Sequence, residues 1–269
     1  MRGTSNTRRA SCLGRRRHCI ASWAVALALW LVLAFWSASP ACADLIGINF
    51  HGGTYGRKIG AKTAGVEPQV NWNDVGWWTV SDLRESTGQV TGVSVTTTTT
   101  TYTYNSYVKV DPPDGGNDYL MRGYIYTSGA SLTVTIAGLE PPFTTDHYDV
   151  IVYFDGNNAS ADWITQYTLS VDGGPPTTLY GKDAKTASWN GTFVEGFGTS
   201  ASDATPGNYV RFTGLTSGAF TLTATPVAGS GAINAIQIIS APEPASLALV
   251  VLGVVAALAN RPRQSRFRR

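Results

Sequence analysis

Residues 148–154 read Tyr-Asp-Val-Ile-Val-Tyr-Phe, a run of β-branched and aromatic side chains. In an extended chain, Val150 and Val152 share one face with Tyr148 and Phe154, as in a strand that covers a core. Residues 220–225, Phe-Thr-Leu-Thr-Ala-Thr, alternate in the same way and place their threonines on the opposite face. These two runs predict β-structure, and no long amphipathic helical pattern competes with them.

Further runs of this kind are separated by Gly, Asp, Asn and Pro, the residues typical of turns. The predicted strands are residues 45–51, 90–104, 119–126, 131–137, 148–154, 164–171, 177–180, 209–212, 219–225 and 233–239. Strands at this spacing predict an all-β fold, an antiparallel two-sheet sandwich of the jelly-roll type. A single sheet closed into a barrel is the alternative.

The six consecutive threonines at 96–101 allow three interpretations. We favour a strand, because threonine is β-branched and Tyr102 and Tyr104 would share one face. A low-complexity linker and an O-glycosylated surface segment are the alternatives.

Charge divides the 269-residue chain into three parts. Residues 44–240 contain 17 acidic and nine basic residues, a formal net charge of −8, whereas the other 11 basic residues lie near the two ends. An acidic domain repels a phosphate backbone, which argues against nucleic-acid binding. All three cysteines precede Asp44. A domain that begins there has no thiol catalysis and no cysteine-ligated zinc.

The N-terminal part has the layout of an export signal. Six arginines within residues 1–17 precede an apolar run at 20–36, and Ala41 and Ala43 occupy the small-residue positions of a signal-peptidase site. We expect a signal peptide at 1–43, with cleavage after Ala43 by signal peptidase once the export machinery has engaged it. An uncleaved membrane anchor is the alternative.

The C-terminal part, residues 241–269, has three features in order. Pro242-Glu243-Pro244 precedes an apolar run at 245–259, and five arginines follow within residues 261–269. As a helix the run would be about 22 Å long, short of a hydrocarbon core of roughly 30 Å. We expect a membrane-inserted helix with the arginine tail on the cytoplasmic side and the central domain outside.

This order of features resembles the PEP-CTERM sorting signal of bacteria. The resemblance covers about the last 28 residues. It implies recognition by the membrane protease-transpeptidase called exosortase, and delivery to the cell surface, often in bacteria that make extracellular polysaccharide. A plain C-terminal anchor is the alternative.

The central domain, residues 44–240, resembles secreted and surface proteins of planctomycete-type bacteria. The matching segments are Ile-Gly-Ile-Asn-Phe at 46–50, Asn-Trp-Asn at 71–73, and Ile-Asn-Ala-Ile-Gln-Ile at 233–238. These motifs are mainly structural. The closing strands more distantly resemble galactose-binding-like jelly rolls, which include carbohydrate-binding modules, and an analogy of fold says little about function.

One loop carries a candidate metal site. Residues 111–118 read Asp-Pro-Pro-Asp-Gly-Gly-Asn-Asp and place Asp111, Asp114 and Asp118 close together. Oxygen-rich loops of this kind suit calcium, although the spacing is not that of an EF-hand. A polar hairpin loop is the alternative.

Tryptophans are the candidates for glycan binding, because an exposed aromatic face stacks on a pyranose while nearby amides or carboxylates bond its hydroxyls. The candidates are Trp77, Trp78, Trp163 and Trp189, the last beside Asn190. For Trp72, between Asn71 and Asn73, we favour a packed side chain whose neighbouring amides brace a loop.

Catalysis has weaker support. No pair of carboxylates stands out for glycoside hydrolysis, and His51 and His147, the two histidines of the central domain, lie far apart without a nucleophile-elbow motif. The leading hypothesis is a non-catalytic protein of the cell surface or extracellular matrix with a structural or adhesive role. A carbohydrate-binding module for an extracellular polysaccharide is second, and a secreted hydrolase is third.

Overall fold

The computed structural model describes residues 43–51, 58–76, 78–98, 101–104, 106, 115–185 and 189–241. The chain divides into two compact units, Met1–Cys42 and Ala43–Arg269, and every described residue belongs to the second. The predicted signal peptide at 1–43, apart from Ala43, and the predicted C-terminal signal from Pro242 onward, with its apolar run at 245–259, lie outside the described residues. Among the residues that the structure describes, no helix has the length and apolar character needed to cross a membrane.

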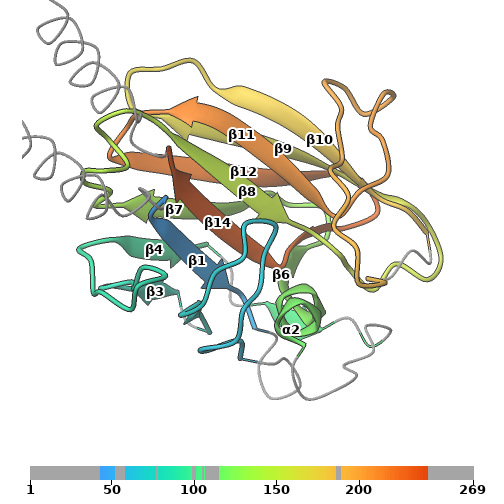
Figure 1. The fold of residues 1–269 in the computed structure, drawn as a ribbon. Coiled ribbons are helices and arrows are strands. Elements are labelled where there is room, and N and C mark those ends of the chain that lie inside the picture. The colour runs from blue at the N-terminus through green and yellow to red at the C-terminus, as the bar shows by residue number, and fades with distance from the viewer. Residues whose placement is uncertain are drawn as a thin grey trace, which may run out of the picture. The chain divides into compact units, whose positions relative to one another are not determined.

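Two antiparallel sheets form the body of the domain (Figure 1). One has five strands in the order β11-β8-β14-β1-β2, in which β1 and β2 alone run parallel. Their bounds are β1 Leu45–Asn49, β2 Asn73–Asp74, β8 Tyr148–Tyr153, β11 Tyr209–Leu215 and β14 Ala235–Ser240. The other has six strands in the order β10-β9-β12-β7-β4-β3. Their bounds are β3 Thr79–Val80, β4 Ser94–Thr97, β7 Leu132–Ala137, β9 Trp163–Val171, β10 Thr177–Asp183 and β12 Ala219–Ala228.

The inner faces of the two sheets enclose one apolar core, which confirms the all-β sandwich predicted from the alternating runs. Val150 and Val152 of β8 pair with Ile238 and Ile236 of β14, and all four side chains are buried. The six-stranded sheet contributes side chains such as Ile136 and Leu222 to the same core. As predicted, Tyr148 and Phe154 lie in this core with the two valines.

A second apolar cluster covers the outer face of the five-stranded sheet. Ile151 and Tyr153 of β8 point into it, so β8 is buried on both faces. Its cover comes from the segment 58–72, from 189–193 and from α2, Gly116–Arg122. Strands covered on both sides have near-continuous apolar sequences, as β14 does.

The sequence prediction was wrong about residues 119–126, expected as one strand. Residues 116–122 form α2, and the strand β6, Gly123–Thr127, begins only after it. Leu120 and Met121 both bury against the second cluster from one side of this short helix. Strand β6 belongs to a small sheet with β13, Gly231–Ile233, and β5, Tyr102–Tyr104, in the order β13-β6-β5.

Two other predicted strands are interrupted. The run 90–104 was expected to be continuous, but β4 pairs with β7 in the six-stranded sheet whereas β5 pairs with β6 in the small sheet. The run 233–239 breaks at Asn234, whose side chain is wholly buried and hydrogen-bonded. In both places the chain passes from one sheet to another, which alternation along the sequence does not reveal.

The long connection between β10 and β11 covers the free edges of both sheets. The Tyr180 amide of β10 donates to the Gly198 carbonyl, and the Gly196 amide donates to the Tyr209 carbonyl of β11. Uncovered edge strands are templates for pairing with other chains. This connection therefore closes one side of the sandwich.

Candidate functional site

The Asn-Trp-Asn motif braces a loop, as predicted. Trp72 is 4% exposed and lies against β1, where a Cβ on Gly47 would come within 2.5 Å of its ring. The Asn71 side chain donates to the Ser86 carbonyl, and the Asn73 side chain donates to the carbonyl of Gly47. The motif ties the segment 58–74 to the sheet, so it is not available as a sugar platform.

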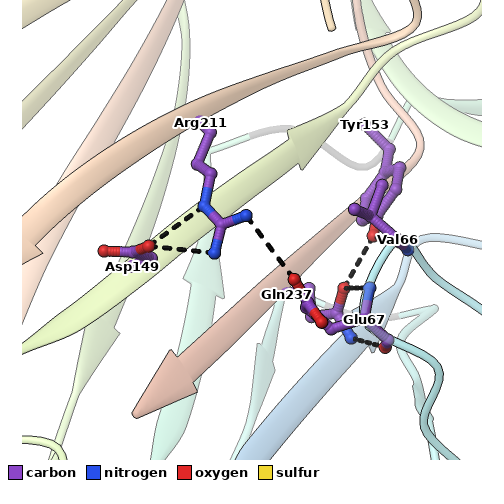
Figure 2. Close-up of polar contacts among 6 residues, drawn as sticks. All are labelled: Val66, Glu67, Asp149, Tyr153, Arg211 and Gln237. Atoms are coloured by element: carbon purple, nitrogen blue, oxygen red, sulfur yellow. Dashed lines mark hydrogen bonds and ion pairs between the residues drawn. The ribbon is translucent and has the colours of Figure 1, made fainter. Parts of the chain in front are cut away.

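A buried amide fastens the same segment to the outer face of the five-stranded sheet (Figure 2). Oε1 of Gln237 accepts the Tyr153 hydroxyl at 2.7 Å, and its Nε2 donates to the Glu67 carbonyl at 2.6 Å. The Tyr153 hydroxyl in turn accepts the Val66 amide at 2.8 Å. Burial raises the pKa of Tyr153, so this hydroxyl stays protonated and keeps donating.

Arg211 lies at the margin of this network and joins two carboxylates (Figure 2). Its Nε donates to Asp149 at 3.0 Å, and its Nη1 lies 3.5 Å from a Glu67 oxygen. The Arg211 and Glu67 side chains are partly exposed, so solvent weakens the second pair. Arg211 thus links Asp149 of β8 to Glu67, and so helps to hold the 64–69 segment against the sheet.

A second polar cluster lies at the ends of β8 and β10. One Asp155 oxygen accepts the Trp189 amide at 2.7 Å, and one Asp183 oxygen accepts the Gly156 amide at 2.8 Å. The Asn234 side chain accepts the Asp155 amide and donates to the Met121 carbonyl. Burial raises the pKa of Asp183 to about 7, and hydrogen bonds from Gly156 and Asn158 oppose the shift.

The structure brings together two residues that the sequence assigned to different sites. Asp118, predicted as a calcium ligand, accepts the indole N–H of Trp189, predicted as a glycan contact, at 2.7 Å. Asp111 and Asp114 lie outside the described residues, so calcium stays a prediction. Within the described part of the chain, no group of three or more His, Cys, Asp or Glu side chains has the arrangement of a metal site.

The other tryptophans differ in exposure. Trp163 packs between two glycines: a Cβ would come within 2.0 Å of its ring at Gly156 and within 2.2 Å at Gly229. Trp189 is 8% exposed and packs on Phe193, with ring centroids 4.6 Å apart. Trp78 is 54% exposed, and Trp77 lies outside the described residues. Trp78 is therefore the described candidate with an accessible ring.

Two surface depressions accompany these features. One of about 180 Å³ lies beside Trp189 and includes Asn190 and Asn208, but both Asn208 amide atoms already bond the backbone of Val194 and Thr192. Sequence reasoning could not find it, because its walls come from residues on both sides of a long loop.

The other depression, of about 190 Å³, brings Glu85 and Glu140 into one polar hollow. Burial, followed by the nearby Asp44 charge, raises the pKa of Glu85. The sequence indicated no carboxylate pair, since these two residues come from separate loops. They are the carboxylates on which the hydrolase hypothesis can be tested.

No protein-family model matches the sequence, and no curated protein is significantly similar to it.

Proposed function

We propose that the chain is an exported protein of the bacterial cell surface, held or sorted at the membrane through its C-terminal segment, with a non-catalytic structural or adhesive role. The same proposal includes the PEP-CTERM signal, processing by an exosortase-type enzyme, a transmembrane helix at 245–259 and the jelly-roll class of sandwich.

The observation that supports it is the position of the two ends of the domain. Strand β1 begins at Leu45, strand β14 ends at Ser240, and the two pair with each other. The Asp44 amide donates to the Ser240 hydroxyl at 2.7 Å, and the Ser240 amide donates to the Asp44 carbonyl at 2.9 Å. The leader and the tail therefore attach at adjacent points. Both apolar segments can reach one membrane while the sandwich stays outside, and cleavage after Ala43 leaves β1 intact.

Mass spectrometry of the cell-associated protein tests this function. We expect a mature N-terminus at Asp44 and a C-terminus that has lost the arginine tail. An intact chain, with leader and tail, dissolved in the cytosol of its native host would contradict the proposal.

Carbohydrate binding through Trp78 is the second candidate function, because its ring is 54% exposed. A glycan array probed with the full chain and with Trp78→Ala tests it. A saturable signal that the variant loses supports a lectin role. A signal of unchanged strength in the variant places the ligand elsewhere.

A further inference from the structure

The outer face of the six-stranded sheet is built from threonines that align across strands. One row runs Thr79, Thr96, Thr135, Thr221 and Ser170 over five strands. A second runs Thr133, Thr223, Thr168 and Thr178 over four strands, and a third runs Thr225, Gln166 and Tyr180 over three. None of these side chains is buried, whereas the alternate positions, such as Ile136 and Leu222, lie in the core.

Charge is absent from these three rows. Their 12 positions hold nine threonines, one serine, one glutamine and one tyrosine. A surface of ordinary composition would be about 25–35% charged, so some three or four charged side chains would be expected here. Charged residues lie just beyond the rows. Lys182 follows two positions after Tyr180 on β10 and pairs with Asp162 at 2.8 Å, and the exposed Asp172 follows two positions after Ser170 of β9.

The hydroxyls of the face pair with one another but retain bonding capacity. The Oγ1 atoms of Thr168 and Thr178 lie 3.0 Å apart, and those of Thr79 and Thr96 lie 3.2 Å apart. A hydroxyl has one donor and two acceptor sites, so each can also bond a ligand. Neighbouring strands are about 4.8 Å apart and alternate residues on a strand about 6.7 Å, so the groups form a repeating array.

These properties select one kind of partner. A polyanion would be repelled by a domain of net charge −8, and the face has no basic residue to attract it. Two copies of this face would have to align their hydroxyls in register, because a hydroxyl buried against a methyl group without a partner is unfavourable. A neutral polysaccharide repeats along its length and has hydroxyls that both donate and accept. Its C–H groups can rest on the threonine methyls.

We propose that the threonine face, defined as the three rows above, binds a neutral polysaccharide outside the cell. The inference rests on the proposed surface location and identifies the partner. The binding itself is measured on purified protein, so its failure is distinguishable from a failure of export, which the mass spectrometry reports.

The test is co-sedimentation of the full chain, in mild detergent, with insoluble cellulose, chitin and mannan and with the anionic polymer alginate. We expect retention by at least one neutral polymer, unchanged when salt is raised to about 1 M, because no ion pair is involved. Retention by alginate alone, lost at high salt, would overturn the proposal, as would retention by none of the polymers.

Variants locate the binding. Thr135→Lys with Thr223→Lys places two protruding charges at the centre of the face, and we expect at least a tenfold loss of binding. Thr135→Val with Thr223→Val keeps the shape but removes two hydroxyls, with a smaller loss of a few fold. Thr213→Lys with Thr216→Lys adds the same charge at exposed positions off the face and should bind as the parent does.

Three results would contradict this site. Equal loss in the face and control variants would mean that charge acts at a distance. If Trp78→Ala lost polysaccharide binding while the face variants kept it, the ligand would lie at Trp78. Concentration-dependent dimers that the face variants abolish, seen by sedimentation, would make the face an interface between copies. Thermal unfolding of each variant checks that it is folded.

Discussion

The packing of Trp163 requires that its neighbour at position 156 has no side chain. Trp163 occupies the space above Gly156, where a Cβ would come within 2.0 Å of the ring. Gly92 has nothing within 4 Å of the corresponding position. The same substitution, glycine to alanine, would therefore meet a packed ring at position 156 and open space at position 92.

We expect Gly156→Ala to reduce the free energy of unfolding by about 1–3 kcal/mol, because the indole must move in a packed region. Gly92→Ala should change it by less than about 0.5 kcal/mol. Denaturant titration followed by tryptophan fluorescence measures both. Equal effects at the two sites would show that the Trp163 contact does not matter.

The Gln237 amide gives a second prediction at this scale. Gln237→Leu removes the acceptor of the Tyr153 hydroxyl and the donor to the Glu67 carbonyl, and leaves both groups buried or partly buried. We expect a loss of about 1–3 kcal/mol in unfolding free energy. Gln89→Leu, at an exposed position, is the control and should be close to neutral. A small loss at Gln237 would mean that water replaces the amide.

At the scale of elements, Asp183 at the end of β10 makes stability depend on pH. Its pKa rises from 3.8 to about 7 on folding because burial disfavours the charged carboxylate. The folded state therefore binds the proton more tightly than the unfolded state. The contribution of the protonated Asp183 to the free energy of unfolding is fully present below about pH 4 and is lost as the pH rises through 7.

We expect Asp183→Asn to remove this part of the pH dependence while its amide oxygen still accepts the Gly156 amide. The difference in unfolding free energy between the parent and the variant should change by a few kcal/mol between pH 4 and pH 8, since one pKa unit is about 1.4 kcal/mol. Urea titrations of both proteins at a series of pH values measure this difference. The contributions of the other carboxylates are common to both proteins and cancel in it. Parallel pH curves would contradict the raised pKa.

For the whole molecule, β1 lies between β14 and β2 in the five-stranded sheet and begins next to the point where the leader attaches. Ile46 and Ile48 are fully buried and pair with Ile238 and Ile236. Each such side chain contributes about 1.5–3 kcal/mol by burial. A chain cleaved before Asp44 keeps these contacts, and one cleaved after Asn49 loses them.

We therefore expect that removing residues 1–43 leaves the thermal midpoint unchanged within a few degrees. Removing residues 1–49 should abolish the cooperative transition. Circular dichroism during heating compares the two proteins. A cooperative transition in the protein that lacks residues 1–49 would mean that β1 is dispensable for folding. The position of cleavage relative to β1 would then not matter for stability.

The sequence by itself determined which side chains of runs such as 148–154 and 220–225 lie in the central core, because side chains alternate along any extended chain. It placed Val150 and Val152 inside, the threonines of 220–225 outside, and Trp72 in a braced loop. These are local properties, and the structure confirms them.

Only the tertiary structure decided the order of the strands, the helix at Gly116–Arg122, and the separation of β4 from β5. A short apolar run suits a helix or a strand equally, and contacts with distant residues select between them. The pairing of Asp118 with Trp189, the hollow shared by Glu85 and Glu140, and the alignment of threonines into rows also depend on register between strands far apart in sequence. That register follows from packing the complete core.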